Sequence, residues 1–183
     1  ENNLISLTDA LEKIHFPKTL DDAEKARQRL SFDELFQIQL SSLSRKKLWE
    51  KEKIKKPWEL NKFAKQIDDF TKKIPFELTD AQKKAVEDIL KDLSSQKPMN
   101  RLLQGDVGSG KTVVAVIASY LAYLNGFQSA FMAPTEILAN QHFKTIDKLL
   151  SPLGVKVELI TGSTKKNINN KFDVLIGTHA LVY

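Results

Sequence analysis

The sequence predicts an α/β fold: a parallel sheet with helices on both faces, preceded by an all-helical N-terminal segment. From residue 75 onward, short apolar stretches alternate with longer helical ones, a pattern typical of a parallel sheet. Residues 1–74 contain no glycine and repeat their apolar residues at helical spacing. We therefore expect a domain boundary near Ile74-Pro75, with a helical segment over residues 1–74 and the sheet domain over residues 75–183.

Four helical stretches are expected before this boundary. Apolar residues recur at helical spacing over 4–14, and a polar helical stretch follows at 21–29. The Ser-x-x-Glu pattern at 31–34 is typical of a capping box and predicts the start of a long helix that ends before Pro57. The last of these helices is expected at 60–73.

The sheet domain is expected to begin with a helix at 79–93. The remaining predicted elements, in order, are a buried strand at 101–104, a helix at 113–124, a strand at 129–133, a helix from Thr135 to about Leu150, a strand at 155–160, a polar loop at 165–171 and a strand at 173–177.

A phosphate-binding P-loop lies between the first predicted strand and the helix that follows it. The motif G-x-x-x-x-G-K-[ST] is matched by Gly105, Asp106, Val107, Gly108, Ser109, Gly110, Lys111 and Thr112. Its glycines let backbone N–H groups point at phosphate oxygens, and the new helix adds its positive end. We expect Lys111 to reach the β- and γ-phosphates of a nucleotide and the Thr112 hydroxyl to hold Mg²⁺.

Polar or glycine-containing turns follow the other predicted strands. The carboxyl ends of parallel strands meet at one edge of the sheet, where ligands of such sheets bind. The residues that we expect at this edge are Pro134, Thr135, Thr161, Gly162, Ser163, Gly177, Thr178 and His179.

Composition excludes several classes of protein. The 183 residues include no cysteine, and the three histidines show no metal-ligand spacing. No apolar run is long enough to span a membrane, so no membrane partner is expected. The N-terminus does not resemble a signal peptide, which favours the reducing cytoplasm.

The net charge of +5 is concentrated in residues 45–56, where seven basic residues stand against two acidic ones. A solvated helix face is the usual explanation for such a run, and contact with a nucleic-acid backbone is the alternative. Leu48 and Trp49 are expected to mark the packed side of the helix. Lys46, Lys53 and Lys56 would then be the lysines available to phosphates.

The motifs resemble those of superfamily two helicases. The resemblance rests on residues 78–82, 103–112, 133–142 and 176–181, and in wording it is strongest to the RecG family. The transcription-repair coupling factor shares Gly-Asp-Val-Gly and Gly-Thr-His. Thr135-Glu136 and the segments at 15–17 and 26–36 look more like RecG.

The resemblance implies a first RecA-like motor lobe and binding of ATP with Mg²⁺. It implies that Gln82 reads adenine, although Thr79-x-x-Gln82 also fits a plain capping box. Phe76 would stack on the base, or else pack in the core. Thr135, Thr161 and Thr178 would contact a DNA strand through its phosphates. Core packing is the favoured role of His142 and His179, in preference to catalysis.

The chain is expected to be a fragment of such a helicase. No apolar strand ends in the Asp-Glu pair that ATP hydrolysis needs, and the family's box is expected just after Tyr183. The DNA-binding wedge and the second RecA-like lobe would also lie outside. The parent reaction would be ATP-driven translocation that remodels stalled forks and Holliday junctions, with no turnover by the fragment. An ATPase unrelated to DNA and a non-enzymatic DNA-binding module remain alternatives.

Overall fold

A computed structural model describes residues 3–162 and 172–181 of the chain. The chain divides into two compact units, Glu1–Glu52 and Lys53–Tyr183. The predicted loop at 165–171 and Ser163 lie outside the described residues.

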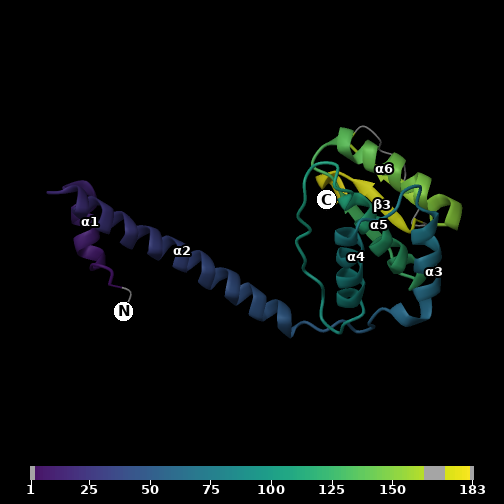
Figure 1. The fold of residues 1–183 in the computed structure, drawn as a ribbon, viewed down its shortest axis with the longest axis horizontal. Coiled ribbons are helices and arrows are strands. Elements are labelled where there is room, and N and C mark those ends of the chain that lie inside the picture. Colours follow the sequence, from purple (N-terminus) through teal and green to yellow (C-terminus); the bar gives the residue numbers. More distant parts are fainter. Residues whose placement is uncertain (1–2, 163–171, 182–183) are drawn as a thin grey trace. The chain divides into compact units, whose positions relative to one another are not determined.

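The first unit is a pair of helices, α1 (Leu7–His15) and α2 (Leu20–Lys51) (Figure 1). They meet at small residues, since Ala10 and Ala26 are both fully buried. An ion pair of 2.6 Å between the Lys13 ammonium and the Asp22 carboxylate also joins them.

The predicted capping box at 31–34 is wrong, because Ser31 lies inside α2. The cap is instead Thr19, whose hydroxyl accepts from the backbone N–H of Asp22 at 3.1 Å. Residues 20–30 contain no proline or glycine, so nothing breaks the helix before Ser31.

The second unit is a parallel sheet with helices packed against it. Its strands are β1 (Ser129–Met132), β2 (Val157–Ile160) and β3 (Val174–Gly177), in the order β1-β3-β2. Its helices are α3 (Leu60–Lys73), α4 (Asp80–Leu93), α5 (Lys111–Leu124) and α6 (Glu136–Leu150), with short 3-10 turns at Ser151–Leu153 and His179–Leu181.

Helix α5 is the centre of the unit. Its residues Val116, Ile117 and Leu121 are fully buried, because α3, α4 and α6 surround it and it also contacts β1 (Figure 1). Helix α3 joins this core through its apolar face, including Ile67 and Phe70. The contacts therefore divide the chain between Glu52 and Lys53, whereas the sequence analysis placed the boundary near residue 74.

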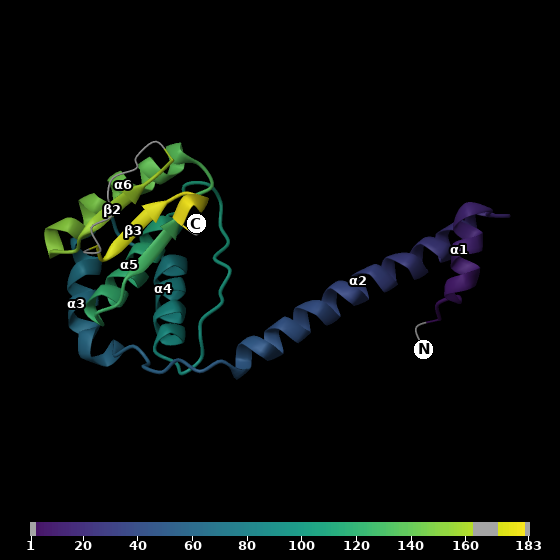
Figure 2. The same cartoon turned by 180° about the vertical axis from the view of Figure 1, so that it is seen from behind.

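Among the described residues, the sheet is in contact with α5 and α6. Helix α6 lies against β2 and β3 (Figure 2), and Phe131 of β1 packs against its His142 with ring centroids 5.2 Å apart. The opposite face of β1 is open, since Ala130 and Met132 are exposed. Covering helices, predicted for both faces, are therefore seen at β1 on one face of the described structure.

The strand predicted at 101–104 does not form. The segment is extended but pairs with no described strand, and Leu102 is 87% exposed. A parallel strand needs a neighbour for its backbone hydrogen bonds, and β1 pairs only with β3 within the described sheet.

Candidate nucleotide and nucleic-acid site

The P-loop runs directly into the first turn of α5. Gly108 and Gly110 have positive φ angles of 81° and 78°, which glycine adopts without steric cost. Gly110 is the N-cap of α5 and carries no side chain, so no side-chain cap bonds the first N–H groups of the helix. The loop thus presents a helix N-terminus that favours an anion such as phosphate.

The Lys111 ammonium sits inside this loop. It donates to the carbonyl oxygens of Gly105 at 2.8 Å and Asp106 at 2.7 Å, and lies 3.4 Å from the Ser109 hydroxyl. Among the described residues, no carboxylate forms an ion pair with it. A phosphate can therefore take up this cation without breaking a salt bridge.

Gln82 links α4 to the P-loop. Its side-chain oxygen accepts from the Thr79 backbone N–H at 2.9 Å, and the Thr79 hydroxyl accepts from the Gln82 N–H at 3.3 Å, so the predicted capping box forms. Its amide nitrogen donates to the Ser109 carbonyl oxygen at 2.8 Å. A Cβ at Gly110 would collide with this amide. One N–H and one lone pair of Gln82 remain for a ligand.

The three strands end in the predicted turns. Thr135 caps α6 by accepting from the Leu138 N–H at 3.3 Å, and Thr178 accepts from the Leu181 N–H at 3.0 Å through its carbonyl. Pro134, Gly162 and His179 are exposed. Thr161 is only 2% exposed, so a strand of DNA could reach this turn through Gly162 but not through the Thr161 hydroxyl.

The basic residues Lys53 and Lys56 lie at the other edge of the sheet. The Ile54 N–H donates to the Gln96 carbonyl oxygen just beyond α4, and Trp58 stacks on Phe127 just before β1, with ring centroids 5.6 Å apart. This segment therefore borders the amino ends of the strands, whereas the predicted turns follow their carboxyl ends. Lys46 belongs to α2, in the other unit.

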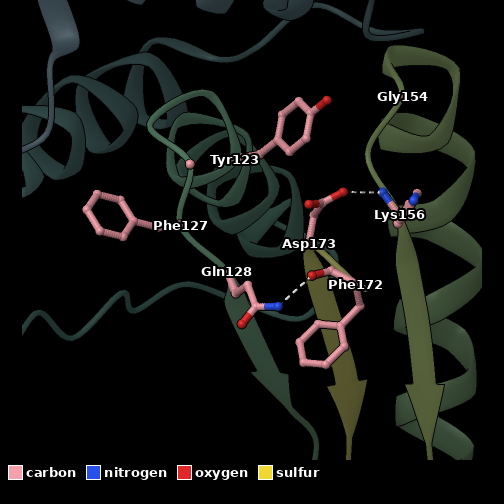
Figure 3. A pocket seen from close by; sticks show the side chains of 8 residues that line it. Tyr123, Phe127, Gln128, Gly154, Lys156, Phe172 and Asp173 are labelled. Carbon is pink, nitrogen blue, oxygen red and sulfur yellow. Dashed lines mark hydrogen bonds between the residues drawn. The ribbon is translucent and has the colours of Figure 1, made fainter. Parts of the chain in front are cut away.

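A hollow of about 700 Å³ also lies at the amino edge (Figure 3). Its polar groups hold the strands together: Asp173 accepts from the Lys156 backbone N–H at 2.8 Å, and the Gln128 amide donates to the Phe172 carbonyl oxygen at 2.7 Å. These bonds join β2 and β1 to β3 where the strands begin. Its position separates it from the P-loop.

A smaller, mostly apolar hollow of about 470 Å³ adjoins the P-loop. Phe76, which is half exposed, borders it, as do Gly110 and Thr112 of the loop. The sequence analysis did not identify the rest of its lining, which is Pro75, Val113, Lys144, Thr145, Lys148 and Leu149. Those α6 residues belong to no recognised motif, so only their position in space reveals them.

Within the described residues, no cluster of three or more histidine or acidic side chains is placed to hold a metal. Arg101 is paired with Asp88 and Asp92 on α4. None of the described helices has the length and apolar character needed to cross a membrane.

The family model of the DEAD/DEAH box helicases matches residues 79–183, which include the P-loop and all three strand-end turns. The chain belongs to the DEAD/DEAH box helicase family. Membership implies the use of ATP, and the P-loop is where this helicase chain would bind it.

Curated relatives extend the similarity to the N-terminal helices. The chain is 46% identical over 192 residues to the ATP-dependent DNA helicase RecG of Thermotoga maritima, covering all of this chain and 24% of that protein. It is 43% identical to RecG of Synechocystis sp., covering 98% of this chain and 22% of that protein. This helicase chain thus spans about a quarter of the length of these relatives, and corresponds to the part of RecG that holds the P-loop.

Solved structures agree. A structure of RecG bound to a three-way DNA junction matches with a TM-score of 0.78 and 46% identity, over 99% of this chain and 26% of that one. A hypothetical ATP-dependent RNA helicase from Sulfolobus tokodaii matches 64% of this chain and 34% of its own, with a TM-score of 0.51. At 23% identity, the second match shows a shared fold only.

Proposed function

We propose that the chain supplies the ATP-binding part of an ATP-dependent DNA helicase that remodels branched DNA, such as stalled forks and Holliday junctions, in recombination and repair. The observation that carries the proposal is the 46% identity to RecG across the whole chain, including a RecG solved on a three-way junction. The P-loop geometry adds a physical reason, because Lys111 and the α5 N-terminus are positioned for phosphate.

In this proposal the P-loop residues 105–112 hold the phosphates of ATP, with Lys111 as the principal cation. The chain fits Mg²⁺ as a partner of the nucleotide, since the Thr112 hydroxyl lies beside Gly110 at the mouth of the loop. When bound, Mg²⁺ would neutralise phosphate charge. Gln82 would offer its remaining N–H and lone pair to adenine, and Phe76 would offer its exposed ring to the base.

DNA would be contacted at two separate places on the second unit. The exposed turns with Pro134, Thr135, Gly162, Thr178 and His179 lie at the carboxyl edge, and Thr161 contributes backbone there. Lys53 and Lys56 lie at the amino edge, and with Lys46 they would follow a phosphate backbone. Neutralising these three lysines is expected to flatten the salt dependence of DNA binding by at most about 0.9 for each phosphate that a lysine no longer neutralises. An unchanged slope would assign them to solubility.

We infer that residues 1–183 alone bind ATP without turning it over. No described strand ends in paired carboxylates, and Arg101 is engaged on α4. The rest of the longer protein, including a wedge and a second lobe, would supply these groups. We also infer a cytoplasmic location, although a relative from Arabidopsis thaliana, 43% identical, is described as chloroplastic/mitochondrial.

The direct test is ATP-driven unwinding of a synthetic three-way junction by the full-length protein that contains these residues. The proposal predicts unwinding that Lys111→Ala abolishes. ATP-driven unwinding that survives Lys111→Ala would contradict it, and so would the absence of any DNA-dependent ATP hydrolysis. For the 183-residue chain, ATP hydrolysis no faster than in Lys111→Ala is expected, with or without DNA.

A further inference from the structure

The hollow between the P-loop and α6 has the shape and chemistry of a nucleoside site. Pro75 and the half-exposed ring of Phe76 form one wall, and the first turn of α5 forms another. The third wall is the second half of α6, where Lys144, Thr145, Lys148 and Leu149 line the hollow. Its volume of about 470 Å³ lies in the range of small-molecule sites, whose walls are mostly apolar with a few polar groups.

Building on the nucleotide-binding function proposed above, we propose that this hollow takes the base and ribose of the bound nucleotide. Lys144 and Lys148 of α6 then become determinants of nucleotide affinity. Gly110 and Thr112 line the hollow, so a base placed against Phe76 leaves its phosphates beside the P-loop. No recognised motif includes either lysine.

The two lysines are suited to this role by their position. Being four residues apart, they share one face of α6, and both are exposed at the rim of the hollow. Neither forms an ion pair with any described carboxylate. The acidic residue between them, Asp147, is instead bonded to the Ser151 hydroxyl. An ammonium group offers three donors and no acceptor, which matches the ring nitrogens of a purine and the oxygens of ribose.

The hollow on the other side of the P-loop is less suited to a base. It has about 390 Å³ and is lined by Gly105, Asp106, Ser109 and Lys111 together with Gln82. The Lys111 ammonium and the Gln82 amide both form hydrogen bonds to loop carbonyls on that side. These polar groups suit phosphate, whereas the apolar walls beside Phe76 suit a planar ring.

The test is calorimetric titration of the 183-residue chain with Mg-ADP and, separately, with Mg-pyrophosphate. The variant is Lys144→Ala/Lys148→Ala. The matched control is Lys91→Ala/Lys97→Ala, which removes the same charge from exposed positions that line neither hollow. We expect the α6 variant to weaken ADP binding about three- to tenfold, with pyrophosphate binding unchanged within about twofold. Replacing both α6 lysines by arginine should restore most of the ADP affinity.

Three results would overturn the assignment. ADP affinity equal to that of the control variant would place the lysines outside the site. An equal loss of pyrophosphate affinity would show that they act as general positive charge, with no contact to the nucleoside. Failure of the parent chain to bind either ligand would remove the proposed nucleotide function as well. By contrast, a loss of affinity in Lys111→Ala without one in the α6 variant would leave that function standing.

Discussion

Gln82 performs two separable tasks, and each can be removed alone. Its side-chain oxygen completes the capping box with Thr79 at 2.9 Å, and its amide nitrogen holds the P-loop through the Ser109 carbonyl oxygen at 2.8 Å. Both bonds are solvent-exposed and neutral, so each is worth about 0.5–1 kcal/mol. The higher helix propensity of alanine returns about 0.3 kcal/mol. Gln82→Ala is therefore expected to destabilise the second unit by about 1 kcal/mol.

Gln82→Glu is the matched control. A glutamate at this position keeps the acceptor of the capping box and gains from the helix N-terminus by about 0.3–1 kcal/mol. It loses the donor to Ser109 and places a carboxylate against that carbonyl. We expect stability within about 0.5 kcal/mol of the parent chain, but an untethered P-loop. Both variants should bind ADP more weakly.

The stability measurement is urea unfolding followed by tryptophan fluorescence. Of the two tryptophans, Trp58 stacks on Phe127 in the second unit, so a Trp49→Phe background makes the signal specific to that unit. Equal stability of Gln82→Ala and the parent chain would refute the assignment of these bonds. Equal destabilisation by Gln82→Glu would show that the capping box is not the source of the effect.

Two further predictions concern other parts of the chain. Gly177→Ala would push a Cβ into the Ile160 carbonyl oxygen of the paired strand, so urea unfolding should show a loss of about 1–3 kcal/mol; parent-like stability would contradict this. In the helix pair, the hydrogen bond from Lys13 lowers the pKa of Asp22, and that from Asp22 raises the pKa of Lys13. The α1–α2 stabilisation should be complete above the ordinary Asp pKa of 3.8 and be lost as the pH falls through the lowered value. It should also be lost as the pH rises through the raised pKa of Lys13. Amide hydrogen exchange across α1 measures this, and an acid limb that persists in Asp22→Asn would count against the pair.

Local signals predicted most of the second unit. The helix at 79–93 and its capping box, the P-loop with α5, and the strands near 129, 157 and 174 all form, each within about two residues of the predicted bounds. These elements carry their own start signals, such as Thr79 and Thr135 at helix N-termini. The edge at which the strand turns gather also follows from parallel pairing alone.

The errors have a common cause: they depend on partners that are distant in sequence. The apolar run at 101–104 reads as a strand, but a strand exists only where another strand pairs with it. The capping pattern at Ser31 is overridden because the chain on both sides is helical. Lys144 and Lys148 carry no motif, and their place beside the P-loop depends on how α6 packs on the sheet.

The most direct measurement of the central claim is the affinity of the 183-residue chain for a fluorescent ADP analogue, compared between the parent and Lys111→Ala. The Lys111 ammonium contacts only the P-loop in the described structure, so the variant should fold as the parent does. Removing a charge-assisted bond to phosphate costs about 1.5–3 kcal/mol, which corresponds to roughly 10- to 150-fold weaker binding. With Lys91→Ala as the control, that weakening is the predicted result. Equal affinity in the parent and Lys111→Ala would contradict the assignment of the P-loop as the nucleotide site.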